Sequence, residues 1–186
     1  TTTAVMALTT AQIAAMETVD VASLNTTNIA ALNSVQVQSL TTRQIIGLTT
    51  AQISALTTTT LQALTTKQIA ALETEDVSLL GSSNVTSLSS TQLRALNTAQ
   101  VAQLTSAQLI GLGSTLLSQL QASQLTGLST GDLNGLASAS LGALTSAQIA
   151  RLTTDQVVNL TTTALSYLST RGVSGLSTSQ IVAMTT

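Results

Sequence analysis

Apolar residues recur along this chain with a period of eight. Every residue whose number is a multiple of eight, from Leu8 to Met184, is Leu or Met. We number positions within each octad so that this row is position eight; position five is then Val, Ile or Leu in every octad, from Val5 to Ile181. Such unbroken self-similarity is typical of repeat proteins, whose units stack and share one core. The sequence therefore predicts a single continuous array of about 23 octads over residues 1–186.

The spacing of the apolar positions argues against one long helix. Positions five and eight alternate five and three residues apart, so the mean spacing is four residues. An α-helix has about 3.6 residues per turn, and an apolar stripe with this spacing would drift around it by roughly 80° per octad. Pairs of Thr residues in many octads also weaken a helix interior, because they are β-branched and compete for backbone hydrogen bonds.

Helices broken once in every octad fit the pattern better. Thr9 and Gln12 have the spacing of a capping box, in which a hydroxyl and a Gln three residues later bond to each other's backbone. Leu8 and Ile13, on either side, have the spacing of a hydrophobic staple. Position two is Ser or Thr at 23 of 24 sites. Either position one or position two can therefore supply the cap.

A β-solenoid is the alternative fold. Positions five and eight have opposite parity, so a straight strand would place them on opposite faces, and each octad would need a corner to turn both inward. Thr, Val and Ile favour strands, whereas Ala, Gln and Leu favour helices. Ten Gly residues are too few to supply a corner in every octad. The sequence predicts a mainly α fold, a solenoid of very short helices built from eight-residue repeats, with the β-solenoid left open.

Position four carries a second, longer period. It is Gln, Asn or Asp at 17 of 23 sites. Four exceptions are spaced at intervals of seven octads: Ala4, Thr60, Leu116 and Gly172. Asp20, Asp76 and Asp132 are spaced at the same interval. This super-repeat of seven octads indicates either tandem duplication of a block or a whole number of superhelical turns.

Composition narrows the functional classes. Charged residues make up 6% of the chain and the net charge is −2, which argues against a nucleic-acid-binding surface because that requires a Lys/Arg face. No run of 18 apolar residues is present, so the sequence predicts no membrane span. Hydrophobic residues make up 44% and the only aromatic residue is Tyr167. We therefore expect a narrow, uniform core of aliphatic side chains.

Candidate chemistry is sparse. The chain has no His or Cys, and a Ser or Thr nucleophile would need a base within reach, so we expect neither an enzyme nor a bound cofactor. The recurring Asp20, Asp76 and Asp132 are candidate Ca²⁺ ligands, since hard cations prefer several oxygen ligands and stacked turns could bring these carboxylates together. The competing interpretation is that these acidic residues lie near helix starts, where the helix dipole favours them.

The consensus octad is Leu-Thr-Thr-Ala-Gln-Ile-Ala-Ala, as in residues 8–15. The motif Leu-Thr-Thr-x-Gln-Ile-x-Ala resembles the octapeptide tracts of very large bacterial secreted or surface proteins of the adhesin-, haemagglutinin- or haem-utilisation-like kind. The resemblance covers the whole chain. It implies an extracellular or cell-surface stalk, spacer or fibre, and it implies no particular binding residue.

The leading functional hypothesis is accordingly a non-enzymatic structural rod in an extracellular or surface bacterial assembly. Neither end resembles the polar capping repeat that an isolated solenoid requires. We therefore expect a segment of a longer chain or a self-stacking unit, whose partners are adjoining repeats of the same protein or further copies stacked end to end. The alternative is an adhesin module that binds a ligand, a glycan or Ca²⁺.

Overall fold

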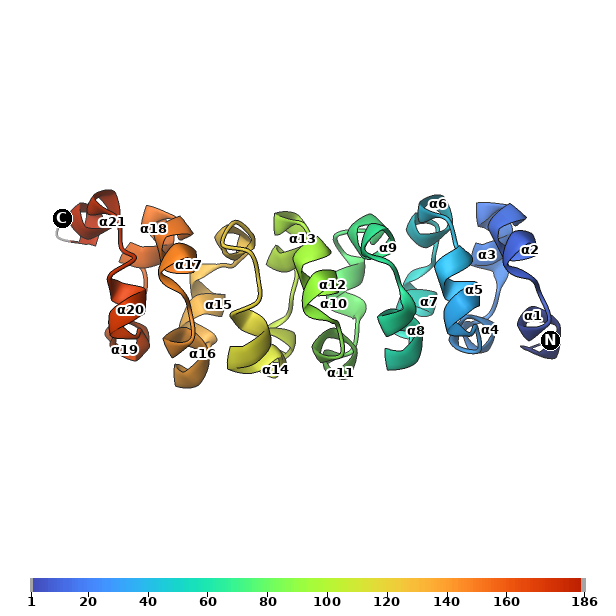
Figure 1. Ribbon diagram of the computed structural model, residues 1–186, viewed down its shortest axis with the longest axis horizontal. Helices are drawn as coiled ribbons and strands as arrows, with labels where there is room; N and C mark the ends of the chain where they lie inside the picture. The colour runs from blue at the N-terminus through green and yellow to red at the C-terminus, as the bar shows by residue number, and fades with distance from the viewer. Residues whose placement is uncertain (1, 185–186) are drawn as a thin grey trace. The chain divides into compact units, whose positions relative to one another are not determined.

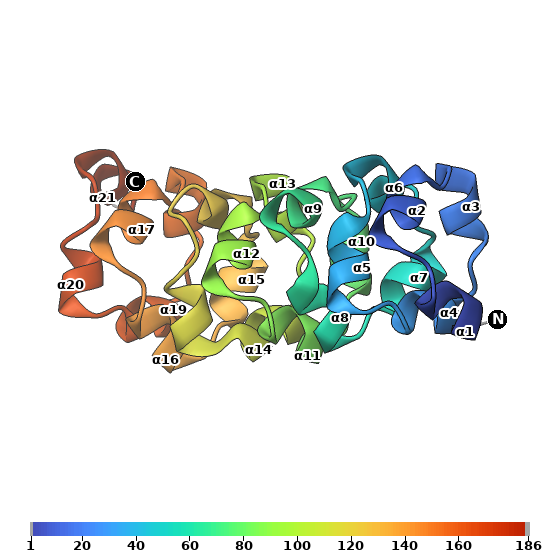
Figure 2. The ribbon, with the colours of Figure 1, turned by 45° about the vertical axis from the view of Figure 1, so that its right-hand side comes forward.

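The structure is a computed structural model that describes residues 2–184. These residues form short helices separated by extended corners, and none of them lies in a β-strand. The mainly α solenoid is thereby confirmed for the described chain, and the β-solenoid is wrong. The helices group into two compact units, unit 1 (Thr1–Ala95) and unit 2 (Leu96–Thr186). The course of the chain through each unit can be followed in Figure 1 and, turned, in Figure 2.

In unit 1 each helix packs on the helix three places later in the chain, which creates three columns. The first column contains α1 (Thr2–Met6), α4 (Thr26–Ala30), α7 (Thr50–Ser54) and α10 (Asp76–Leu79). The second contains α2 (Thr10–Ala15), α5 (Ser34–Ser39), α8 (Thr58–Ala63) and α11 (Ser82–Thr86). The third contains α3 (Thr18–Ser23), α6 (Thr42–Ile46), α9 (Thr66–Ala71) and α12 (Ser90–Ala95). One coil of the solenoid therefore consists of three octads.

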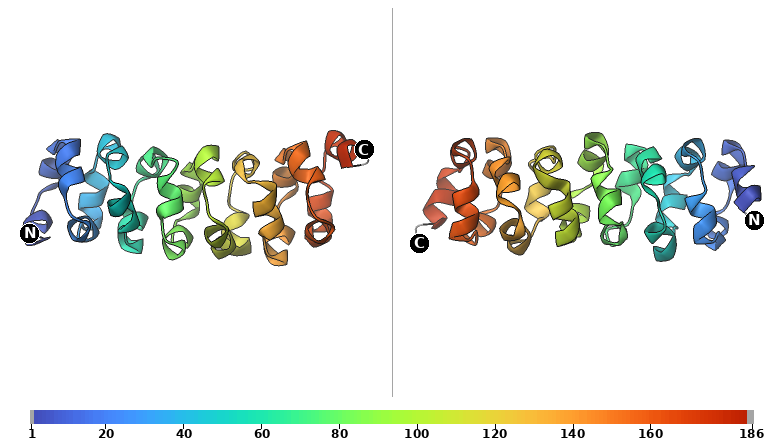
Figure 3. Two further views of the ribbon diagram at one scale, coloured as in Figure 1. Left: turned by 180° about the vertical axis from the view of Figure 1, so that it is seen from behind. Right: turned by 90° about the horizontal axis from the view of Figure 1, so that it is seen from below.

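Unit 2 follows the same rule. Its first column contains α13 (Thr98–Ala102), the 3₁₀-helix η1 (Gln124–Gly127), α17 (Ser146–Arg151) and α20 (Thr170–Val173). The second contains α14 (Ser106–Leu117), α15 (Thr130–Gly135), α18 (Thr154–Val158) and α21 (Thr178–Met184). Helix α14 spans two octads and also packs on α16 (Ser138–Gly142), which in turn packs on α19 (Thr162–Tyr167). Figure 3 shows these short helices from behind and from below.

The corners come from two extended residues in succession, at positions eight and one. Leu40 has φ −60° and ψ 133°, and Thr41 has φ −73° and ψ 158°. Two residues in this region of φ/ψ space cannot continue a helix, so the chain changes direction before the next one begins. Three such corners bring the chain back to its starting column.

One corner differs from the rest. Gly113, at position one, has φ 61° and ψ −174°, and it divides α14 into two octad helices. A positive φ is costly for residues that carry a Cβ, which explains why this position is Gly. Nothing lies within 4 Å of where its Cβ would be. Gly is therefore required here by the positive φ of the backbone and not by crowding from neighbouring atoms.

The two apolar positions form the core as predicted. At position five, Ile53 and Leu61 are fully buried, and at position eight Leu56 is 6% exposed. Position six faces outward: Ile46, in the octad before that of Ile53, is 47% exposed. The core contains only aliphatic side chains because two of them per octad, from three octads, fill the narrow space inside a coil.

The phase of the octad can be tested with two Ile residues. We expect Ile53→Ala to lower the free energy of unfolding by about 2–5 kcal/mol, since it removes buried methyl groups and leaves a cavity. Ile46→Ala, the matched control on the outer face, should change it by less than about 1 kcal/mol. Urea denaturation followed by circular dichroism measures both, and equal losses would contradict the assignment of the faces.

Candidate functional site: a glutamine ladder between coils

The most specific chemistry of the chain lies at position four. Gln52 is 1% exposed, Gln100 is 0% and Gln108 is 1%, although an amide is costly to bury without hydrogen bonds. Each of these side chains points into the solenoid from the first turn of its helix. We call the Gln residues at position four the glutamine ladder.

One end of each amide caps its own helix. In α7 the Thr49 backbone N–H donates to Gln52 Oε1 at 2.8 Å, and the Gln52 backbone N–H donates to Thr49 Oγ1 at 3.3 Å. This is a capping box, and it satisfies backbone donors that a helix start leaves without partners. The same arrangement recurs at α2, α5, α6, α9, α13, α14, α17 and α18.

The structure settles which position supplies the cap. The N-cap residue is at position one, for example Thr49 or Asn33, and its side chain accepts from the N–H of position four. Position two is already the first helical residue, so its interpretation as the cap is wrong. Ser and Thr recur there without making the capping bond.

The other end of each amide reaches the preceding coil. Gln52 Nε2 donates to the carbonyl of Leu24, 28 residues earlier, at 2.7 Å, and to that of Val21, 31 residues earlier, at 2.8 Å. Both carbonyls belong to the C-terminal end of α3, where a helix leaves acceptors short of partners, and the Val21 carbonyl also accepts from the Leu24 N–H. The same two separations recur at 2.6–3.2 Å for Gln36, Gln44, Gln68, Gln92, Gln148, Gln156 and Gln180.

A single side chain therefore closes two helix ends in two different coils. Every buried side-chain nitrogen and oxygen among the described residues has a hydrogen-bond partner. The sequence indicated the capping half of this role through the spacing of Thr and Gln. It did not reveal the bond between coils, although the capping box uses only the amide oxygen and leaves the amide nitrogen to find another partner.

Other residues at position four make part of this connection or none of it. Asn84 Nδ2 donates to the carbonyl of Leu56, 28 residues earlier, so a shorter amide preserves one bond. Thr60 turns its hydroxyl back to the Thr57 carbonyl at 2.9 Å. Ala164 and Gly172 have no side-chain donor. The stack therefore tolerates octads in which position four makes no bond to an earlier coil.

The three recurring Asp residues do not share one environment. Asp20 lies exposed on α3 in the third column of unit 1, and Asp76 lies buried on α10 in the first column. Asp132 belongs to α15 of unit 2, where it accepts from the Ser129 backbone N–H at 3.0 Å. Seven octads are two coils and one third, so each step of the super-repeat changes column. Of the two interpretations of the super-repeat, tandem duplication is the one that fits a coil of three octads.

Asp76 occupies a buried position four, where most octads of the interior carry Gln. It is 3% exposed, and its Oδ2 accepts from the Glu73 backbone N–H at 3.1 Å, as a Gln oxygen would. Leu48 and Ile45 precede it by the same two separations, 28 and 31, at which Gln52 donates to carbonyls. Burial raises the pKa of Asp76 above its ordinary value, and the nearby Glu73 and Glu75 raise it further, against a lowering by the Glu73 N–H bond. A carboxylate here has no hydrogen to donate.

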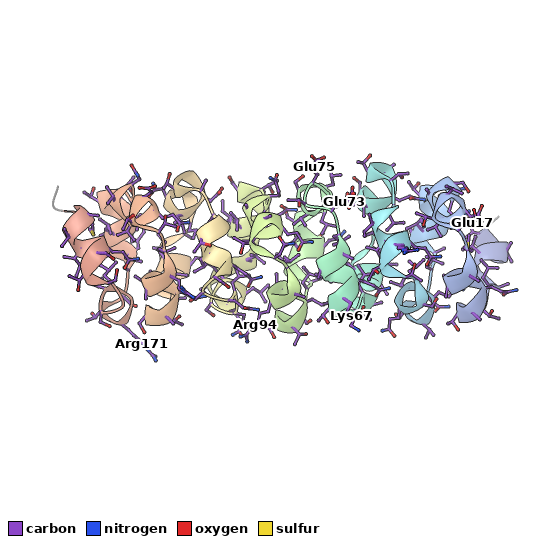
Figure 4. All side chains as sticks on the ribbon, turned by 90° about the horizontal axis from the view of Figure 1, so that it is seen from above. Glu17, Lys67, Glu73, Glu75, Arg94 and Arg171 are labelled. Carbon is purple, nitrogen blue, oxygen red and sulfur yellow. The ribbon has the colours of Figure 1, made fainter. Side chains whose placement is uncertain are left out.

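The surface offers little else that could hold a ligand. Among residues 2–184 there is no pocket and no group of three acidic, His or Cys side chains placed to hold a metal ion. Figure 4 shows Glu73 and Glu75 pointing outward along one edge of unit 1, and Lys67 pointing outward along the opposite edge. The described helices are too short and not apolar enough for any of them to cross a membrane.

Comparison with known families agrees with the octad. The ALTTAQ repeat family matches residues 13–50, 69–106, 77–114 and 125–162, together more than half of the chain. The chain belongs to the ALTTAQ repeat family. Each match begins at a position-five residue of the core, and the matches that begin at 13, 69 and 125 follow one another at the seven-octad interval. No curated protein matches the sequence.

The bond between coils of this ALTTAQ repeat chain can be isolated with Gln52→Glu. The carboxylate keeps the acceptor for Thr49 but loses the donor to Val21 and Leu24, and it buries a charge against their carbonyls. We expect a loss of roughly 2–4 kcal/mol in unfolding free energy at neutral pH. Gln12→Glu is the matched control, because Gln12 caps α2 in the same way but is exposed, and within the described residues its amide bonds only to Thr9. Equal effects in urea denaturation would show that only capping matters.

Asp76→Gln tests the ladder in the opposite direction. The new amide supplies the missing donor, and we expect a gain of about 1 kcal/mol in unfolding free energy near pH 7. Because the pKa of Asp76 is raised in the folded chain, the folded state binds this proton more tightly than the unfolded state does. The stability that this proton contributes is fully present below the ordinary pKa of 3.8 and is lost as the pH rises through the raised value.

The gain from Asp76→Gln should therefore shrink as the pH falls toward about 3.5. Thermal melts of both proteins across this range measure the difference, and Asp20→Gln, on the exposed α3, serves as the control. A gain independent of pH would mean that the carboxyl does not titrate in the ladder.

Proposed function

We propose that this ALTTAQ repeat chain is a non-enzymatic structural element, a stalk, spacer or filament segment of an extracellular or surface bacterial assembly. The observation that carries the proposal is the glutamine ladder, since within each unit its bonds join one coil to an earlier coil. The apolar side chains at positions five and eight, and the Gln side chains at position four, are used in contacts inside the solenoid. What they build is a stack that lengthens by repetition.

The outer surface supports the same role. Positions two and three carry mainly small polar residues, and only 6% of all residues are charged. The location outside the cell rests on the resemblance of the octad to tracts of secreted and surface proteins. A spacer places few chemical demands on its surface beyond solubility, which agrees with position three accepting Ala, Arg, Lys, Glu or Asp.

Insertion of whole coils tests the proposal. Duplicating residues 42–65 adds three octads, one complete coil, and should lengthen the molecule by about 10 Å, the distance between packed helices. Duplicating only residues 42–53 adds one and a half octads and should disrupt the stack, because it moves positions five and eight off the inner face. Small-angle X-ray scattering gives the maximum dimension, and circular dichroism the helix content. An unchanged dimension with the longer insert would contradict a spacer.

A further inference from the structure

A second kind of connection between coils lies at position six. Asn134 Nδ2, at the end of α15, donates to the carbonyl of Asn159, 25 residues later, at 3.0 Å. Its Oδ1 accepts from the backbone N–H of Thr161 at 2.9 Å. Asn159 ends α18 and Thr161 begins α19, so these two hydrogen bonds, which we call the Asn134 clasp, hold the corner between the two helices. At the same separation in unit 1, Gln62 Nε2 donates to the carbonyl of Ser87 at 3.1 Å.

The clasp takes the place of a missing capping box. In octads with a capping box, the N–H of the cap residue donates to the side chain at position four. Position four of α19 is Ala164, whose side chain cannot accept a hydrogen bond. Thr161 Oγ1 still accepts from the Ala164 N–H at 3.1 Å, but the Thr161 N–H donates to Asn134 instead. Asn134 therefore satisfies a helix start that α19 cannot satisfy by itself.

Asn134 is also the one Asn in the sequence that precedes a Gly. In an Asn-Gly pair the Gly backbone nitrogen can attack the Asn side-chain carbon Cγ and displace ammonia, which closes a five-membered succinimide ring. Gly permits this attack best, because it has no Cβ to crowd the nitrogen and its backbone rotates most freely. Nothing lies within 4 Å of where a Cβ of Gly135 would be, so neighbouring atoms do not crowd the site either.

The end of α15 is accessible and weakly held as a helix. Asn134 is half-buried and Gly135 is exposed, so water reaches both. Two of the six helical residues, Gly131 and Gly135, are Gly, the residue that disfavours a helix most after Pro. Helix ends open locally far more often than the whole fold unfolds. Each opening releases the Gly135 nitrogen from the helix and the Asn134 amide from the clasp.

We propose that Asn134 is a site of spontaneous deamidation, and that the reaction breaks the clasp irreversibly. The Gly135 nitrogen gives up its proton and bonds to Asn134 Cγ. The bond from Cγ to Nδ2 breaks, and Nδ2 leaves as ammonia. Water then opens the ring: cleavage at Cγ leaves aspartate, and cleavage at the main-chain carbonyl leaves isoaspartate. The sum consumes one water and releases one ammonia, and it requires no oxidant or reductant.

Neither product restores the clasp. Aspartate at this position keeps an acceptor for the Thr161 N–H, but it has no hydrogen to donate to the Asn159 carbonyl and brings a negative charge beside it. Isoaspartate inserts an extra carbon into the backbone two residues before Leu136, which is buried in the core. The connection of α15 to the corner between α18 and α19 is therefore lost. The proposed structural role stands or falls separately, because a spacer does not depend on this reaction.

Peptide mass spectrometry of the folded chain, incubated at mildly alkaline pH in water enriched in oxygen-18, tests the reaction. We expect Asn134 to react before the other six Asn residues, with heavy oxygen in the new carboxyl group and ammonia released in equal amount. In urea, where α15 is unfolded, Gly135→Ala should slow the reaction at least about tenfold, because the added Cβ crowds the attacking nitrogen. Gly131→Ala, the matched control in the same helix, should leave the rate in urea unchanged. Earlier modification of another Asn, or equal rates of the two variants in urea, would overturn the proposal.

The loss of the clasp is tested with Asn134→Asp, which reproduces one of the two products. We expect its melting temperature to fall by about 2–4 °C. Asn97→Asp is the matched control in the same unit, since Asn97 Oδ1 caps α13 by accepting from the Gln100 N–H at 2.8 Å, and Asp caps a helix equally well. The chain aged to completion should melt at the temperature of the Asn134→Asp variant or below it. If that variant melts like the wild type, the clasp holds nothing and the proposal is wrong.

Discussion

A helix of five or six residues cannot satisfy its own backbone, and this constraint shapes the whole fold. The first four N–H groups and the last four C=O groups of any α-helix lack partners within it. In α7 or α18, of five residues each, these groups make up nearly the entire backbone. Such helices persist only where other groups bond to both ends, and the position-four Gln does this with one amide.

The glutamine ladder also explains why the core can consist of aliphatic side chains alone. Aliphatic burial is non-directional and would tolerate rotation or slippage of one coil on another. Hydrogen bonds from Gln to two named carbonyls are directional, and an amide buried without them is costly. Leu and Ile therefore supply most of the stabilisation, whereas Gln fixes the register at which coils stack. Aromatic side chains would not fit so regular and narrow an interior.

Much of this could be derived from the residues alone. The core followed from the row of Leu at position eight and of Ile and Val at position five, and the helix breaks followed from the Thr and Gln spacing. The number of octads in a coil did not follow, because it depends on the angle of each corner, and one octad looks the same whether two or three complete a coil. Which carbonyls lie within reach of each Gln depends on that number, so the bond between coils was equally beyond prediction.

The position of the cap shows a subtler limit. Position two carries a hydroxyl more regularly than position one, and this regularity suggested that it caps the helix. The cap is nevertheless at the less regular position one. A cap needs only an acceptor at the right geometry, so Thr, Ser and Asn serve alike, and Gly81 and Ala137 start helices with no side-chain cap bond. Variation at a position therefore does not mean that its role is weak; here it reflects a role that several side chains can fill.

The three-column arrangement also gives the seven-octad period a physical context. Between the first and last coils, octads in every column bury positions five and eight, and a Gln at position four can bond to an earlier coil. A block of seven octads changes column when it is duplicated, but it meets the same contacts in its new place. Duplication therefore requires a whole number of octads and not a whole number of coils. Asp76 marks the limit of this tolerance, because a short acidic side chain that suits the exposed site of Asp20 becomes a buried carboxyl in the interior of the stack.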